Sequence, residues 1–421
     1  MADPIWTTRR QFLRQGLTLV GAGATVPGFI DQTALALAGP DGARAVKSQP
    51  GVPDDRILVV VQMAGGNDGL NTVIPFGHDI YRKSRPKLAI PADEVLRIND
   101  DLGFHPQAAG LKSLYDDGLL AVVQGVGYPN ANRSHFKSTD IWETASPEGR
   151  MHTGWIGRYF DHECAGSDPC PPQRGVALKA EAPLAMQGEA FRGVTFTNPQ
   201  SLQWRRERQE VMFDAFKKLG APESNAPMTE LAYLRRTALD ARLSATEIRA
   251  ASRGEAQVNY PQFPFAQALR NVGRMIASEM PTRIYYVSMG GFDTHSGQTP
   301  RHRQLMTQLA GSLRAFISDL ADQGNLDRVV VMTFSEFGRR VTENASGGTD
   351  HGEAAPMFLI GTKVAAGVHG THPDLENLHR GDLAFNLDFR RVYASVLGDW
   401  LEADAGKLLG RKFDPLKLIR V

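Results

Sequence analysis

Residues 56–63 read RILVVVQM, and residues 64–71 continue as AGGNDGLN. The first stretch is a short β-branched apolar run, which is typical of a parallel strand buried on both faces. The second is a glycine-rich turn that places a carboxylate, Asp68, just beyond the strand. In open parallel sheets, ligands bind beyond the carboxyl ends of the strands. This stretch therefore predicts a parallel sheet and the edge of that sheet at which a site would lie.

Similar apolar runs recur at 119–126, 283–289, 328–334 and 356–360, and helix-like segments separate several of them. The clearest helix is predicted over 301–323, where leucine and phenylalanine recur at three- and four-residue steps. Strands that alternate with helices predict an α/β fold with a mainly parallel central sheet and helices on both faces. An antiparallel sandwich would not supply helices between its strands.

Two further segments differ from this pattern. Residues 39–55 are rich in glycine, proline and charge and are interpreted as a linker. Residues 201–256 are polar, charged and helix-prone, without a strand signal, and predict a helical insertion. We expect that insertion to belong to one α/β domain spanning 56–421.

Charge and hydropathy exclude some functions. The 421 residues carry 47 lysines and arginines against 46 aspartates and glutamates, a net charge of +1. So balanced a chain lacks the electrostatic footprint of a nucleic-acid-binding protein. No apolar run of membrane-spanning length follows the N-terminal region, so we expect no transmembrane segment in the mature chain.

The N-terminal region resembles a twin-arginine export signal. Residues 7–14 (TTRRQFLR) place two arginines before an apolar pair, a mildly apolar stretch follows over 17–30, and Ala36-Leu37-Ala38 offers a peptidase site. Residues 1–38 are thus predicted to be a signal peptide, with the twin-arginine export machinery as partner and a periplasmic or secreted location. The alternative is a basic amphipathic first helix of the mature domain.

Cys164 and Cys170 are the two cysteines of the chain and lie in a loop-like, proline-containing stretch. A local disulfide would suit an oxidising compartment. A zinc site needs further ligands, and only His162 lies beside them. Two unpaired thiols are the third possibility, and the sequence leaves all three open.

Acidic residues and histidines follow three of the predicted strands. GGFDTH (290–295) follows one strand, SEFGR (335–339) follows another, and TDHG (349–352) comes soon after. Any one of these motifs alone is commonly a turn, a helix cap or a solvated surface group. Together they place carboxylates beside imidazoles, which is how proteins hold divalent metals. The predicted ligands, for zinc, manganese or calcium, are Asp68, Asp293, His295, Glu336, Asp350 and His351.

These motifs, together with NRSHFKSTDIWET (132–144), carry a family resemblance. The chain from residue 56 onward resembles the DUF1501 family of exported bacterial proteins, which is grouped with the alkaline phosphatase superfamily. The resemblance implies an alkaline-phosphatase-like fold. It implies no reaction, because the family has no established activity to carry over.

The superfamily pattern implies roles for particular residues. Asp68 corresponds to a metal-binding aspartate after the first strand, and Ser134 to a nucleophile at a helix N-terminus, where N–H groups favour an oxyanion. Phe337 stands where a metal-binding histidine is expected, which favours one metal ion over two.

Three further residues are candidates for binding substrate: Asn67, Arg133 and His105. Arg133 and Arg339 could each clamp an anionic ester oxygen with both arms of the guanidinium. Surface ion pairing is the alternative for both, and it is slightly favoured for Arg339. His105 could reach the site or could cap the helix that starts near Gln107. Ser134 could likewise be a helix cap rather than a nucleophile.

Two hypotheses follow. The leading one is an exported metal-dependent hydrolase in which Ser134 attacks a phosphate or sulfate ester of a small molecule or polymer. The rival is a non-catalytic, metal-binding protein of the same fold that serves in binding or assembly in the cell envelope. Phe337 favours the rival, whereas Ser134 together with Asp68 favours the enzyme.

Overall fold

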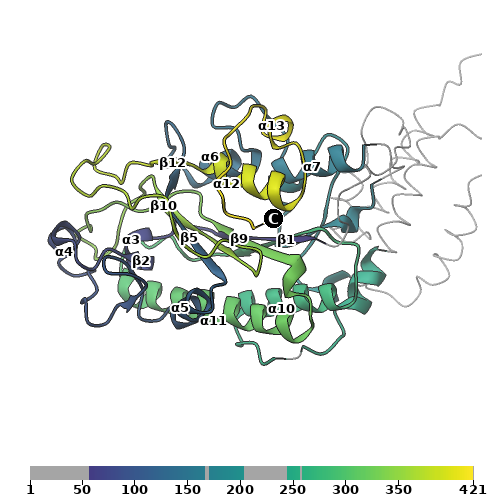
Figure 1. The fold of residues 1–421 in the computed structure, drawn as a ribbon, viewed down its shortest axis with the longest axis horizontal. Coiled ribbons are helices and arrows are strands. Elements are labelled where there is room, and N and C mark those ends of the chain that lie inside the picture. The colour runs from purple at the N-terminus through teal and green to yellow at the C-terminus, as the bar shows by residue number, and fades with distance from the viewer. Residues whose placement is uncertain (1–55, 166–169, 203–243, 257, 421) are drawn as a thin grey trace, which may run out of the picture.

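One large sheet crosses the molecule, and helices cover both of its faces (Figure 1). The computed structural model describes residues 56–165, 170–202, 244–256 and 258–420. Among these, nine strands form the central sheet in the order β11-β5-β10-β9-β1-β8-β6-β7, with β12 paired to β5. The strand pairs are parallel except that β10 runs antiparallel to both β5 and β9. The predicted α/β fold with a mainly parallel sheet is confirmed.

The strands of this sheet are β1 (Ile57–Met63), β5 (Leu120–Gly127), β6 (Gly175–Leu178), β7 (Val194–Phe196), β8 (Ile284–Met289), β9 (Val329–Phe334), β10 (Ala355–Ile360), β11 (Gly367–His369) and β12 (Leu387–Asp388). A small antiparallel sheet in the order β2-β4-β3 is formed by β2 (Val73–Ile74), β3 (Leu96–Arg97) and β4 (Gly103–Phe104).

The helices are α3 (Gly69–Thr72), α4 (Asp79–Ser84), α5 (Ala109–Asp116), α6 (His135–Thr144), α7 (Trp155–Glu163), α10 (Pro264–Ala277), α11 (Gln298–Asp322), α12 (Phe389–Ser395) and α13 (Ala405–Leu408). Helices α5, α10 and α11 lie on one side of the sheet, and α6, α7, α12 and α13 lie on the other (Figure 1). Short helical turns are η1 (Pro172–Arg174), η2 (Leu184–Met186), η3 (Pro199–Leu202), η4 (Leu326–Arg328) and the π-helical η5 (Val396–Trp400).

The two helical layers explain why β1 is continuously apolar. Successive side chains of a strand point to opposite faces. Val59 and Val61 pack into the core that α5, α10 and α11 cover, whereas Leu58 and Val60 pack into the core beneath α6, α7 and α12. All seven residues of β1 are buried. At about 25 cal/mol per Å² of buried apolar surface, these two cores are the main source of the fold's stability.

Some predicted segments lie outside the described residues. The signal peptide and the linker fall within 1–55, and most of the predicted helical insertion falls within 203–243. Residues 244–251, at the end of that insertion, are helical. Among the helices that the structure describes, none combines the length and hydropathy needed to cross a bilayer.

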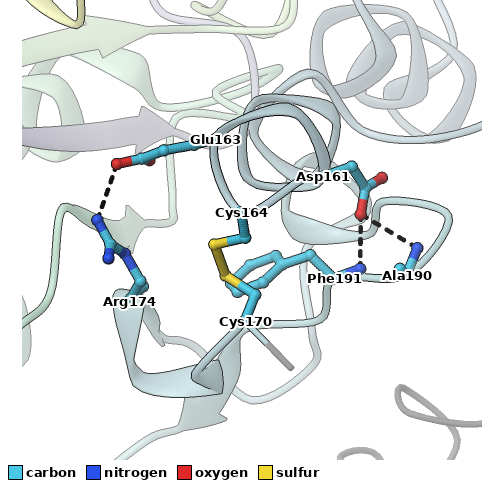
Figure 2. Close-up of a disulfide and its surroundings, with 7 residues drawn as sticks. All are labelled: Asp161, Glu163, Cys164, Cys170, Arg174, Ala190 and Phe191. Atoms are coloured by element: carbon cyan, nitrogen blue, oxygen red, sulfur yellow. Dashed lines mark hydrogen bonds and ion pairs between the residues drawn. A yellow bond between two sulfur atoms is a disulfide. The ribbon is translucent and has the colours of Figure 1, made fainter. Parts of the chain in front are cut away.

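The two cysteines form a disulfide, Cys164–Cys170, at the C-terminal end of α7 (Figure 2). Two acidic residues near the C-terminal end of α7 make further contacts with neighbouring segments. Glu163 pairs with Arg174 at 2.8 Å, and the Asp161 carboxylate accepts hydrogen bonds from the backbone N–H groups of Ala190 and Phe191. The disulfide therefore closes a short loop between α7 and the turn that leads into β6.

Candidate functional site

The carboxyl ends of three neighbouring strands supply the framework of the site. Strand β1 lies between β8 and β9, with Met63 level with Met289 and Gln62 level with Phe334. The chain segments 64–68, 290–295 and 335–339 therefore leave the sheet side by side. Residues 350–352 join them, because Asp350 and Gly352 form backbone hydrogen bonds with Arg340 and Gly338. Four sequence segments thus meet at one edge of the sheet.

Three histidine rings surround the carboxylate of Asp293 at this edge. His295 Nε2 lies 3.1 Å and His351 Nε2 lies 3.3 Å from Asp293 Oδ1. His135 Nε2, from the first residue of α6, lies 3.5 Å from Oδ2. The Nε2 atoms of His295 and His351 are 2.9 Å apart. Ligand atoms of His135, Asp293 and His351 all lie within 4.8 Å of one another. His135, Asp293, His295 and His351 are called the His–Asp cluster below.

The Nδ1 atom of each ring contacts an oxygen on the outside of the His–Asp cluster. Glu336 lies 2.8 Å from Nδ1 of His135, and Asp350 lies 3.1 Å from Nδ1 of His295. The backbone oxygen of Arg133 lies 2.7 Å from Nδ1 of His351. Ionised carboxylates and carbonyls only accept hydrogen bonds, so each Nδ1 carries a hydrogen. Each neutral ring therefore turns an unprotonated Nε2 inward.

This arrangement fits a bound cation. Two lone pairs that face each other at 2.9 Å, beside a carboxylate, repel unless a proton or a metal ion lies between them. Nε2 of His135 is also buried without a hydrogen-bond partner among the described residues. Outer carboxylates and carbonyls that fix the Nδ1 hydrogen are the usual companions of metal-binding histidines. The residues thus suit a divalent ion.

The electrostatics of the His–Asp cluster agree. Burial alone would raise the pKa of Asp293, but the Arg339 guanidinium at 2.7 Å and the nearby histidines hold it at about 2. Burial lowers the pKa of His351, so its ring is neutral near pH 7. The hydrogen bond to Glu336 raises the pKa of His135. Asp293 is therefore ionised and His351 offers a lone pair, as metal ligands must.

Arg339 joins three of the strand-end segments. Its guanidinium is buried and donates to the backbone oxygens of Gly65, Gly66, Phe292 and Thr349, as well as to the carboxylate of Asp293. The surface ion pairing that the sequence favoured for this arginine is wrong. Its planar fork instead fixes the position of Asp293 relative to β1.

The predicted ligands fall into an inner and an outer set. Asp293, His295 and His351 lie in the His–Asp cluster. Glu336 lies behind His135 and also accepts a hydrogen bond of 2.8 Å from the N–H of Gly65. Asp350 lies behind His295. Glu336 and Asp350 are therefore placed to orient histidines rather than to contact an ion in this arrangement.

Asp68 lies apart from these histidines. Its carboxylate pairs with Arg85 at 2.7 Å, accepts a hydrogen bond from Gln298, and is buried. Burial raises the pKa of Asp68, but Arg85, His302 and the hydrogen bond from Gln298 together outweigh burial, so the pKa lies below its ordinary value. We accordingly leave Asp68 out of the ligand set that we propose below. In this structure it holds the glycine-rich turn onto the region around α4.

The residues predicted to bind substrate have mainly structural contacts. Asn67 is buried; its N–H donates to Ser335 Oγ, and its Oδ1 accepts from Thr72. His105 is buried against the ring of His302, accepts a hydrogen bond from the N–H of Gln107, and has its pKa lowered to about 3, chiefly by burial.

Ser134 lies just before α6, at the edge of the His–Asp cluster. It is exposed, and its side chain makes no capping hydrogen bond to the helix. Its neighbour Arg133 contributes a backbone oxygen to His351, while the guanidinium pairs with Asp382. The structure thus gives Ser134 no capping function.

Phe337 packs against the histidines. Its ring centroid lies 4.8 Å from that of His135 and 4.5 Å from that of His351. Gly66, which has a φ of +79°, lies so close that a Cβ there would be 2.4 Å from the Phe337 ring. Phe337 is therefore an apolar wall that limits how the two rings can turn.

His135 is the functional residue that sequence reasoning missed. It directly follows Ser134 in NRSHF, a motif that we considered for its serine. The signal was present: a histidine in the first turn of a helix that follows the carboxyl end of β5. What the sequence does not show is that this turn lies beside Glu336, 201 residues further along the chain.

The family model described as "Protein of unknown function (DUF1501)" matches residues 55–408. No curated protein matches the chain in sequence.

Distant resemblances to solved structures include the PsFucS1 sulfatase from Pseudoalteromonas sp., with 11% identity and a TM-score of 0.36, covering 86% of this chain and 69% of that chain. The lipoteichoic acid synthase LtaP from Listeria monocytogenes is 12% identical, with a TM-score of 0.36, and the match covers 93% and 82%. A protein in the alkaline phosphatase superfamily from Vibrio parahaemolyticus is 8% identical, with a TM-score of 0.32 and coverage of 82% and 71%.

Proposed function

Given that the chain belongs to the DUF1501 family, a family of unknown function, we propose that it is an exported, metal-dependent hydrolase of phosphate or sulfate esters. The observation that carries the proposal is the inward direction of three histidine Nε2 atoms around Asp293. Their outer nitrogens are held by Glu336, Asp350 and the carbonyl of Arg133.

The proposed ligands are His135, Asp293, His295 and His351. Three imidazoles and one carboxylate suit zinc or manganese, whereas calcium prefers six to eight oxygen ligands. When bound, such an ion would stabilise negative charge on the ester oxygens. Arg339 keeps Asp293 ionised and in place, and Phe337 keeps the rings from turning.

We assign the nucleophile to Ser134. It precedes α6, whose first N–H groups have no partner within the helix and favour a negatively charged oxygen. The bond from Ser134 Oγ to phosphorus or sulfur would form as the bond to the leaving alcohol breaks, and the hydroxyl proton would end on the departing oxygen. Water would then hydrolyse the serine ester and regenerate the hydroxyl.

The experiment is an ester screen with the purified protein after loading with zinc or manganese. Ser134→Ala should abolish turnover while leaving metal content and melting temperature unchanged, because the hydroxyl makes no capping bond. Ser346→Ala, at another exposed loop serine, is the control and should retain full activity. Full activity in Ser134→Ala would contradict the assignment of the nucleophile.

A second candidate is a non-catalytic metal-binding protein of the cell envelope. Phe337 favours it, because this apolar ring fills space directly beside His135 and His351. The same screen separates the two functions. Metal-loaded protein that binds its ion tightly but hydrolyses no phosphate or sulfate ester would favour the non-catalytic function.

A further inference from the structure

A second group of polar side chains lies along the same edge of the sheet as the His–Asp cluster. Gln62 of β1 is level with Ser288 of β8. Leu178, the last residue of β6, is level with Val287, which brings Lys179 level with Ser288. Strands β1, β8 and β6 are neighbours in the sheet. Gln62, Ser288 and Lys179 therefore form one row across three parallel strands, called the polar row below.

Three donors in and beside the polar row converge on one acceptor. The Oε1 atom of Gln62 lies 3.2 Å from Lys179 Nζ, 3.2 Å from Ser288 Oγ and 3.1 Å from the hydroxyl of Tyr286. One amide oxygen has two lone pairs, so it cannot satisfy all three donors fully. The hydroxyl of Tyr286 also donates a hydrogen bond of 2.8 Å to the carboxylate of Glu143. The two lone pairs of Gln62 Oε1 then accept one hydrogen bond each from Lys179 and Ser288.

The burial of each side chain shows which members of the polar row a ligand could reach. Gln62, Tyr286 and Glu143 are buried, and Glu143 also accepts a hydrogen bond from the N–H of Ala185. Lys179 and Ser288 are only partly buried. A lysine ammonium has three N–H donors, and among the described residues only Gln62 accepts one. Glu143 is near enough to interact with the charge of Lys179, but the two side chains are not joined by a hydrogen bond. The accessible end of the polar row thus carries an ammonium group with two unused N–H donors.

The polar row and the proposed metal centre lie along the same edge of the sheet and are joined by helix α6. Phe334 of β9 is level with Gln62, and Glu336, which holds His135, comes two residues later. Helix α6 begins at His135 and reaches Glu143, whose carboxylate binds Tyr286 beside Gln62. The same helix contacts the backbone oxygen of Glu336 through Ser138 and Trp142. One helix therefore connects the His–Asp cluster with the polar row.

We propose that Lys179 and Ser288 form an oxyanion-binding subsite for a second sulfate, phosphate or carboxylate group of the substrate. An ammonium only donates hydrogen bonds, and a serine hydroxyl donates readily, so together they recognise an acceptor with negative charge. The preferred substrate then carries two anionic groups, one for hydrolysis and one for recognition. The inference about the substrate rests on the proposed hydrolase activity, whereas the inference that Lys179 binds an oxyanion does not depend on it.

The test measures binding of inorganic sulfate, and separately phosphate, by calorimetry. Four single variants are compared with the unchanged protein: Lys179→Gln, Lys179→Arg, Ser288→Ala and Lys137→Gln. Lys137 is an exposed lysine of α6, so its variant removes the same charge outside the polar row. All five proteins are also prepared with Asp293→Asn, which disables the proposed metal centre, so that binding to a metal ion cannot mask binding at Lys179.

In the Asp293→Asn background, sulfate should still bind, and Lys179→Gln should weaken it at least about tenfold, the loss of a hydrogen bond to a charged group. Ser288→Ala should weaken it less. Lys179→Arg and Lys137→Gln should bind as before, and Lys179→Arg also checks that position 179 tolerates substitution. Equal binding in Lys179→Gln, or loss of all binding on Asp293→Asn alone, would overturn the subsite.

Kinetics separate this inference from the proposed function. With an ester that carries a second anionic group, Lys179→Gln should raise KM with little change in kcat, and an ester without that group should show no difference. If Lys179 binds sulfate but the protein hydrolyses no ester, the hydrolase proposal fails while the oxyanion site stands.

Discussion

Arg339 shows how much of the site depends on one buried side chain. Its guanidinium reaches four backbone oxygens and the carboxylate of Asp293. Lysine keeps the charge but has no planar fork, so Arg339→Lys should leave several buried oxygens without donors. We expect metal affinity to fall about 10- to 100-fold, the usual loss for a residue that orients a ligand.

Chelator competition measures that affinity. Arg340→Lys is the matched control, since Arg340 is the next residue and is partly exposed. Unchanged affinity in Arg339→Lys, or equal losses in both variants, would show that Arg339 does not position Asp293.

The buried pair of Asp68 and Arg85 is expected, unlike Arg339, to affect the stability of the protein and not its binding of metal. Because Asp68 contacts Arg85 and Gln298, Asp68→Asn should leave metal content unchanged. Arg85→Met should cost about 3–5 kcal/mol of the free energy of unfolding, because it leaves a buried carboxylate without its partner. Denaturant titration and metal analysis of both variants check this. Loss of the ion in Asp68→Asn would instead make Asp68 a ligand.

The same pair predicts a pH dependence. The pKa of Asp68 in the folded protein lies below its ordinary value of 3.8, because Arg85, with smaller contributions from His302 and Gln298, outweighs the effect of burial. Its contribution to stability is therefore fully present well above pH 3.8 and falls as the pH drops through the folded-state pKa. In Arg85→Met, this part of the acid dependence should disappear.

At the level of single residues, sequence reasoning located the strand-end carboxylates and histidines but could not sort them. Asp293, Glu336 and Asp350 all follow or adjoin strands, yet only Asp293 lies between histidine Nε2 atoms. Whether a carboxylate contacts an ion or an outer Nδ1 depends on side-chain direction. One-dimensional spacing does not determine that direction.

At the level of elements, the Cys164–Cys170 disulfide ties the end of α7 to the turn before β6. With a sequence separation of 6, the closed loop is short, and the chain-entropy model gives it about 2 kcal/mol. The double variant Cys164→Ser, Cys170→Ser should lose about that much stability and keep its metal, because the disulfide lies away from the His–Asp cluster. Thermal unfolding with and without a reducing agent measures the effect.

The control is built into that comparison: the reducing agent should lower the melting temperature of the wild-type protein and have no effect on the double variant. An identical response of both proteins would show that the two cysteines are not bonded in solution.

The elements themselves followed from the sequence to different degrees. The apolar runs correctly predicted β1, β5, β8, β9 and β10, because each is long and buried. The antiparallel direction of β10 could not be predicted, since an apolar run carries no sign of its direction. Strands as short as β11 and β12 give too few residues for a periodicity to be seen.

At the scale of the whole molecule, we propose export by the twin-arginine route, on the strength of Arg9 and Arg10. Replacing both by lysine should trap the precursor in the cytoplasm, since the route's receptors recognise the arginine pair. Cell fractionation followed by immunoblotting measures this. Lys47→Arg, which conserves charge outside the signal, should export normally. Normal export of the double-lysine variant would contradict the proposed localisation.

The whole molecule also explains why its site is hard to see in sequence. His135 and His351 lie more than 200 residues apart, and they meet because α6 and the segments after β8 and β9 reach one edge of the sheet. A sequence shows which residues follow strands. The strand order, with β1 between β8 and β9, decides which of those residues become neighbours.

The most direct test of the central claim is the metal content of gently purified protein, measured by mass spectrometry. The wild-type protein should carry about one equivalent of zinc or manganese. His135→Ala and Asp293→Ala should lose most of it, whereas His152→Ala, at an exposed histidine outside the His–Asp cluster, should retain it. Wild-type protein that carries no divalent ion and gains no thermal stability on adding zinc or manganese would contradict the account.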